Sequence, residues 1–199
     1  MAGDWLGERR TEVAADRILD AAEQLFTEHD PASVGMNEIA RAAGCSRATL
    51  YRYFDSRESL RTAYVHRETH RLGREILASI ERIDDPREKL VASIAATLRM
   101  VRENPSLAAW FGSTRLPIGG ELAGQSQVIT ALASGFLNSL GHSPGPADAS
   151  DVERRARWAV RVIISMLMFP GRDEDDERAM IEEFVLPVVA PVSARQATQ

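Results

Sequence analysis

Several residue types and patterns are scarce in this chain of 199 residues. Cys45 is its only cysteine, so no intramolecular disulfide can form, and such usage is typical of a reducing cytosol. The longest apolar run, residues 158–169, is interrupted by Arg161 and Ser165 and is shorter than the roughly 20 apolar residues that span a bilayer. The polar start of the sequence lacks the apolar segment of a secretory signal. We therefore expect a soluble, cytoplasmic protein without a membrane partner.

Basic side chains are fewer than acidic ones. The chain holds 24 Lys and Arg against 29 Asp and Glu, which gives a net charge of −5. This balance argues against a protein that coats nucleic acid non-specifically, because such binding depends on a strongly positive surface. Residues 37–61 are an exception, with five arginines against three acidic residues. That local excess indicates one small surface able to meet DNA.

Strand-like alternation is almost absent, and apolar residues recur at helical spacing through nearly the whole chain. Asp85-Pro86 and Asn104-Pro105 have the cap-then-proline pattern that opens a helix. Clusters of Gly, Pro and Ser predict loops at 116–120 and 141–150. We predict an all-α fold of about nine helices. Their expected ranges are 13–28, 37–43, 47–53, 56–80, two helices that begin at 86 and 105, and then 121–140, 151–169 and 174–189.

Residues 38–57 carry the most informative pattern. Ile39 and Ala43 share one helical face, and Gly44 then stands where a left-handed turn favours glycine. Ser46 follows at the N-cap position of a second short helix, in which Leu50 points inward. Two short helices joined by a tight turn, the second with exposed donors, are the layout of a helix-turn-helix whose second helix enters the major groove of DNA.

The segment from residue 22 to residue 60 resembles the amino-terminal domain of the TetR family of transcriptional regulators. Its Leu-Tyr-x-Tyr-Phe-x-Ser-x-Glu-x-Leu ending is much more specific than a bare helix-turn-helix. The family usually has Lys where this chain has Arg57, and both side chains can meet a phosphate. The residues that carry the resemblance are Ile18, Ala22, Leu25, Phe26, Ile39, Ala40, Ala43, Gly44, Leu50, Tyr51, Tyr53, Phe54, Ser56, Arg57, Glu58 and Leu60.

The resemblance implies two domains, a helix-turn-helix DNA-binding domain at 1–58 and an effector-binding and dimerisation domain at 59–199. Within the first, Arg47 stands at the helix start, where it could reach a guanine edge. By resemblance, Tyr51, Tyr53 and Arg57 meet phosphates of the DNA backbone. The full predicted DNA-binding set is Ser33, Asn37, Ser46, Arg47, Thr49, Tyr51, Arg52, Tyr53 and Arg57.

The second domain has two candidate surfaces. The resemblance implies that its last two helices pair with those of a second copy, and the predicted interface is Ile163, Leu167, Ile181, Phe184, Val185 and Val188. The resemblance also implies a cavity for an effector, although the same apolar side chains could simply fill the core. The predicted lining is Met100, Leu107, Trp110, Phe111, Leu132, Phe136, Trp158 and Met166, with Arg102, Arg115 and Arg161 as cations that could face it.

No catalytic signature is present, and no cofactor is expected. His66 and His70 have a spacing that can bind a metal, but no third ligand is evident, so we predict no metal site. We therefore expect a homodimeric regulator, not an enzyme, that binds a near-palindromic operator in double-stranded DNA. It would act as a repressor that a small hydrophobic effector releases. The alternatives are an activator of the same fold and a cytosolic helical ligand carrier or enzyme.

Overall fold

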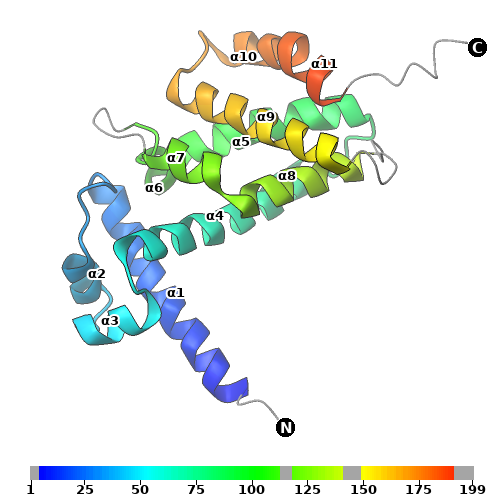
Figure 1. The fold of residues 1–199 in the computed structure, drawn as a ribbon. Coiled ribbons are helices and arrows are strands. Elements are labelled where there is room, and N and C mark those ends of the chain that lie inside the picture. Colours follow the sequence, from blue (N-terminus) through cyan, green and yellow to red (C-terminus); the bar gives the residue numbers. More distant parts are fainter. Residues whose placement is uncertain (1–4, 113–117, 141–148, 191–199) are drawn as a thin grey trace, which may run out of the picture.

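The computed structural model describes residues 5–112, 118–140 and 149–190 (Figure 1). The described residues form helices and turns and contain no strand, as the sequence predicts. None of their helices is both long enough and apolar enough to cross a membrane. In chain order the elements are α1 (Trp5–Glu28), α2 (Met36–Ala42), α3 (Arg47–Tyr53), α4 (Arg57–Ser79), α5 (Pro86–Glu103), α6 (Pro105–Ala108), α7 (Ile118–Gln125), α8 (Gln127–Ser139), α9 (Ala149–Met168), α10 (Glu174–Met180), the π-helical segment η2 (Ile181–Val185) and α11 (Leu186–Val189).

Three predicted helices differ from the observed ones. The first begins at Trp5, eight residues before the expected start at residue 13. The expected helix 121–140 is divided, because the hydroxyl of Ser126 caps a new helix by accepting from the Ile129 N–H (3.2 Å). The preceding helix, α7, begins inside the segment predicted as a loop at 116–120. The last helix contains a π turn, in which the Leu186 N–H donates to the Ile181 carbonyl five residues earlier. Pro187 follows directly and has no N–H with which to continue an α-helical ladder.

The first three helices and the start of α4 form a unit that we call the reader. Gly44 ends the turn after α2 with a φ of +66°, and the Ser46 hydroxyl caps α3 by accepting from the Thr49 N–H (3.0 Å). The remaining helices form a larger body, and α4 extends from the reader into that body (Figure 1). The body has its own apolar core, built mainly from α5, α8, α9 and the last helical turns.

Three aromatic rings join the reader to the body. Phe26 of α1 meets the edges of Tyr64 and Trp110, with ring centroids 5.1 and 5.0 Å away. Tyr64 of α4 stacks on Trp110, which follows α6, at 5.7 Å. All three rings belong to the same buried cluster as the reader's own core. The apolar core of the reader therefore continues across the predicted domain boundary between residues 58 and 59.

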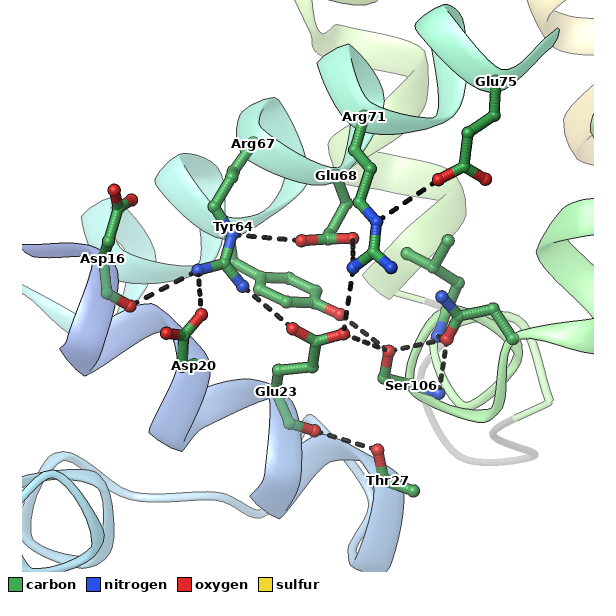
Figure 2. Close-up of polar contacts among 12 residues, drawn as sticks. Asp16, Asp20, Glu23, Thr27, Tyr64, Arg67, Glu68, Arg71, Glu75 and Ser106 are labelled. Atoms are coloured by element: carbon green, nitrogen blue, oxygen red, sulfur yellow. Dashed lines mark hydrogen bonds and ion pairs between the residues drawn. The ribbon is translucent and has the colours of Figure 1, made fainter.

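A polar network around Arg67 reinforces this junction (Figure 2). The guanidinium of Arg67, on α4, donates to Asp20 (2.7 Å) and Glu23 (3.0 Å) of α1 and to the neighbouring Glu68 (3.0 Å). A longer bond runs to the backbone carbonyl of Asp16 (3.4 Å). Glu68 is only 3% exposed, and burial together with the nearby Glu23 carboxylate raises its pKa. Arg67 is thus the cation that compensates a buried carboxylate and ties α4 to α1.

The same network reaches α6. The Tyr64 hydroxyl donates to the Ser106 Oγ (3.0 Å), and Ser106 donates in turn to the Asn104 Oδ1 (2.7 Å). The Asn104 side chain also caps α6, because it accepts from the N–H groups of Ser106 (3.0 Å) and Leu107 (3.3 Å). Burial raises the pKa of the Tyr64 hydroxyl, which therefore stays protonated as a donor. Three helices from the reader and the body thus meet in one satisfied set of hydrogen bonds.

We predict opposite effects on stability for two glycine-to-alanine changes. A Cβ at Gly119 would lie 2.6 Å from the Trp110 carbonyl oxygen, so α7 must shift away from the junction, and Gly119→Ala should destabilise by about 1–3 kcal/mol. Gly73 lies inside α4, and a methyl group added there would have no neighbour within 4 Å, so Gly73→Ala should stabilise by about 0.5–1 kcal/mol. Urea unfolding of both variants measures the difference. Two changes of the same sign would contradict the close approach at Gly119.

We also predict unequal effects for two neighbouring arginines. Arg67→Met leaves Glu68 buried without its close cation and should destabilise by about 3 kcal/mol. Arg71→Met is the matched control, because the Arg71 side chain is 56% exposed against 22% for Arg67, and its contacts with Glu23 and Glu68 are 4.0 and 3.9 Å long. Arg71→Met should lower the free energy of unfolding by less than about 1 kcal/mol. Equal losses in chemical unfolding would show that Arg67 does not hold the junction.

Candidate nucleic-acid interface, dimer face and cavity

The candidate DNA-binding helix is α3, which presents its polar side chains to solvent. Arg47, Tyr51 and Arg52 are exposed on it, while Leu50 is fully buried against the reader core. The Arg47 guanidinium lies over the Tyr51 ring at 5.3 Å, and that of Arg52 lies over the Tyr53 ring at 5.2 Å. Each cation is thus held beside a phenol, so that a guanidinium and a hydroxyl are presented together.

Two smaller side chains at the start of α3 have a structural task as well. The Ser46 and Thr49 hydroxyls are 2.8 Å apart, and Ser46 also accepts from the Thr49 N–H. Ser46 is therefore engaged in capping the helix whose first residue is Arg47. This cap fixes the direction in which the exposed end of α3 points.

The segments on either side of α3 supply the remaining predicted contacts. Asn37 is exposed at the start of α2, and the exposed Ser33 donates its hydroxyl to the Asp30 carbonyl (2.7 Å). Arg57, at the first turn of α4, donates to the Ala32 carbonyl (3.4 Å). None of the nine predicted residues is buried, and all lie in α2, in α3 with its cap, in the loop before α2 or at the first residue of α4. Their contacts with DNA stay predictions.

Arg61 is a reader residue that the sequence did not single out. Arg61 lies one turn after Arg57 on α4 and donates to the Pro31 carbonyl. Its partial burial and the nearby positive charge of Arg57 lower the pKa of Arg61. Arg57 and Arg61 together hold the start of α4 against the loop that precedes α2. The i, i+4 spacing of two arginines in the basic segment was the available signal.

The candidate dimer face is an exposed apolar surface on the last helices. Phe184 is 62% exposed in η2 and Trp158 is 46% exposed on α9; Val188 of α11 and Phe169, just after α9, are exposed too. The α11 helix packs against α9, so these side chains belong to adjoining elements. Large apolar side chains in such numbers on neighbouring helices are typical of a surface that another chain covers.

The predicted interface residues divide into two groups in this structure. Phe184 and Val188 face solvent, as an interface requires. Ile181 and Val185 are buried in the core of the body, and Ile163 and Leu167 are half-buried against that core. The helical period explains the division, because Ile181 and Val185, four positions apart, share the inward face, whereas Phe184 and Val188, also four apart, share the outward face.

The predicted effector residues do not come together around one cavity. Trp110 lies in the junction cluster, and Phe111 packs against that cluster. Met166 and Phe136 belong to the body core or pack against it. Leu132 and Trp158 are exposed. The helical spacing of these apolar side chains could not distinguish residues that fill the core from residues that line a cavity. Of the eight, only Met100 and Leu107 line the cavity described next.

An open groove of about 390 Å³, which we call the cavity, lies between α4, α5 and α6. Its lining combines apolar side chains with three carboxylates and one guanidinium, and it borders the junction network, with which it shares Glu68 and Arg71 (Figure 2). The acidic lining is not evident from the sequence, because charged residues at helical spacing on α4 are also typical of a solvent-exposed face. The lining residues are Glu68, Arg71, Leu72, Glu75, Met100, Glu103, Asn104, Pro105 and Leu107.

Two of the three cations that were expected to face an effector, Arg102 and Arg161, lie elsewhere. Arg102 donates to both Glu177 oxygens (2.8 and 2.7 Å) and to the Met166 carbonyl (2.9 Å), so it ties α5 to α9 and α10. This bidentate contact lowers the pKa of Glu177. Arg161 is exposed on α9, and Arg115 lies outside the described residues. Within the ranges that the structure describes, no three His, Cys, Asp or Glu side chains are placed to hold a metal ion.

Comparison with known proteins agrees with this architecture. Residues 18–64 match the sequence profile of bacterial regulatory proteins of the tetR family. An uncharacterised HTH-type transcriptional regulator of Mycobacterium tuberculosis H37Rv is 72% identical over 195 residues, which cover 98% of this chain and 95% of that protein. The regulator AlkX of the same organism is 38% identical over 86% of this chain and 83% of its own length.

Solved structures show the same fold. The crystal structure of the TetR family repressor AlkX from Dietzia sp. strain DQ12-45-1b, implicated in biodegradation of n-alkanes, superposes with a TM-score of 0.63. That chain is 27% identical, and the match covers 87% of this chain and 93% of the other. The reader motif, the all-helical body and these relatives agree, and the chain belongs to the TetR family of DNA-binding bacterial transcriptional regulators.

Proposed function

We propose that the protein is a homodimeric repressor that acts in the cytoplasm and binds a near-palindromic operator through two copies of α3. The observation that carries this proposal is the capped, exposed α3 helix with its paired arginines and tyrosines. In a two-fold dimer, two such helices would enter successive major grooves on one side of the duplex. The overall charge of −5 would keep binding to other DNA weak.

A repressor relative supports repression, and the junction between the reader and the body supports release by an effector. The structurally similar AlkX of Dietzia sp. is a repressor, which favours repression here. A small molecule with an apolar body would bind in the body domain, 59–199, and favour a conformation whose reader domains, 1–58, are misplaced for the operator. Because the reader and the body share one core at Tyr64 and Trp110, a shift in α4 or α6 must also move α1. An activator of the same fold remains the alternative, and the position of the operator relative to the promoter distinguishes the two.

The direct test is selection of bound sequences from random duplex DNA by the purified protein. We expect a palindromic motif with two half-sites, and footprinting on genomic DNA should find it over a promoter. Repression predicts that transcription from that promoter rises when the gene for this protein is deleted. A selection that yields no motif would refute operator binding, and a fall in transcription would establish the activator instead.

Two arginines should have different roles on that operator. Arg47→Ala should relax specificity at one position of each half-site, because a bidentate guanine contact provides about 1–3 kcal/mol of discrimination. Arg57→Ala should weaken binding on all sequences alike and lower the salt slope by about one unit, because a phosphate contact positions without specifying. Arg82→Ala, an exposed arginine after α4, serves as the control and should change neither quantity. If Arg47→Ala selects the same sequence motif as the wild type, Arg47 does not contact a base.

The apolar face of the last helices should hold the dimer. Phe184→Asp would place a carboxylate in the interface, where an unpaired charge costs several kcal/mol, so the variant should sediment as a monomer and bind its operator weakly. Leu77→Asp makes the same change at an exposed apolar residue of α4 and should leave the dimer intact. Circular dichroism confirms that both variants fold. A folded Phe184→Asp dimer would place the interface on another surface.

A further inference from the structure

The cavity between α4, α5 and α6 carries an excess of negative charge. Glu68 and Glu75 reach it from α4, and Glu103 reaches it from the end of α5. Arg71 is the one basic side chain of its described lining. The apolar part of the lining is Leu72, Met100, Pro105 and Leu107. The lining side chains therefore combine an apolar surface with three carboxylates and one cation, while Arg67 and Arg99, which do not line the cavity, also pair with Glu68 and Glu103.

The existing ion pairs leave two of these carboxylates weakly held. Arg71 is shared among Glu75 (3.4 Å), Glu68 (3.9 Å) and Glu23 of α1 (4.0 Å), and among the described residues Glu103 pairs with Arg99 alone, at 3.6 Å. The Glu75 and Glu103 side chains are more than half exposed, and such pairs contribute little. Glu68, in contrast, is buried and held by Arg67 at 3.0 Å. Glu75 and Glu103 are therefore free to exchange their present partners for a ligand.

We propose that this cavity binds an organic cation, an ammonium or amidinium group attached to an apolar body. The cationic group would lie between Glu75 and Glu103, and the body would pack on Met100 and Leu107. An anion would meet repulsion from Glu75 and Glu103, whose ion pairs are weak, and a neutral ligand would cover part of these carboxylates without compensating their charge. This inference rests on the proposed function, because it names the chemical class of the effector.

The position of the cavity gives such a ligand a route to the reader. A second cation beside Glu75 and Glu68 competes with Arg71, whose guanidinium also faces Glu23 of α1 (Figure 2). Glu23 is bound to Arg67, and its carboxylate lies 3.4 Å from the Ser106 hydroxyl, which donates to Asn104 at the cap of α6. Ligand binding would therefore redistribute the ion pairs that hold α1, and with it the operator-binding helices, against the body.

Three probes of similar shape and different charge test the proposal. Titration calorimetry of the full chain at low salt compares 4-phenylbutylamine, 4-phenylbutan-1-ol and 4-phenylbutanoate. We expect the amine to bind about tenfold more tightly than the alcohol, since two surface carboxylates each contribute up to about 1 kcal/mol. The carboxylate probe should bind most weakly of the three. Absence of binding by the amine at millimolar concentration, or equal affinity for amine and alcohol, would overturn the proposal.

Variants locate the site. The double substitution Glu75→Gln with Glu103→Gln removes charge without changing shape, so the preference for the amine should vanish while the affinity for the alcohol is retained. Glu153→Gln is the matched control, because Glu153 is exposed on α9, pairs with Arg157 at 3.9 Å and does not line the cavity. If the double variant keeps its preference for the amine, the cation does not bind between these carboxylates.

Operator binding separates this inference from the proposed function. In the wild type, the amine should lower operator affinity, and the double variant should lose that response when its operator affinity is compared with and without the amine. Normal operator binding without any preference for the amine would overturn the ligand class alone. Failure of the wild type to bind any operator would instead refute the proposed function.

Discussion

The Arg67 guanidinium, between three carboxylates at the meeting of α1 and α4, is the interaction on which the rest of the structure depends. It donates to Asp20, Glu23 and Glu68, and only Glu68 is fully buried. Without Arg67, Glu68 would be a buried carboxylate without its close cation, which costs several kcal/mol, and separation of α1 from α4 would break the Arg67 contacts with Asp20 and Glu23. Phe26, Tyr64 and Trp110 seal the same junction with apolar contacts. The operator-binding helices are thus built onto the body through one continuous core.

This junction gives a physical basis for regulation at a distance. The α3 helix is fixed to the reader by Leu50 and by its Ser46 cap, and the reader is fixed to α4 and α6 by the rings and the Arg67 network. The cavity begins at the same network, since Glu68 and Arg71 belong to both. A ligand that binds one arrangement of these ion pairs better than another shifts the population of reader positions. Coupling therefore requires no long pathway, because the cavity and the junction share Glu68 and Arg71 of α4.

The predictions from sequence held best where the pattern was local. The Gly44 turn, the Ser46 cap and the inward Leu50 were readable because each depends on neighbours within one or two turns. The cavity could not be predicted from the sequence, because its lining comes from three helices and depends on how these helices cross. Apolar spacing could not tell that Trp110 fills the junction whereas Trp158 faces solvent. The same limit hid Glu68, which looks like a solvated charge until α1 and α6 cover it.

Hydrogen exchange of the full chain with and without its selected operator tests the coupling through this junction most directly. Operator binding should slow amide exchange in α2 and α3 and also at the junction, in residues 64–75 and 104–110, although DNA touches neither range. That result would show that the reader and the cavity share one conformational equilibrium. Protection confined to α2, α3 and the first turn of α4, with unchanged exchange around Arg67 and Asn104, would contradict the account.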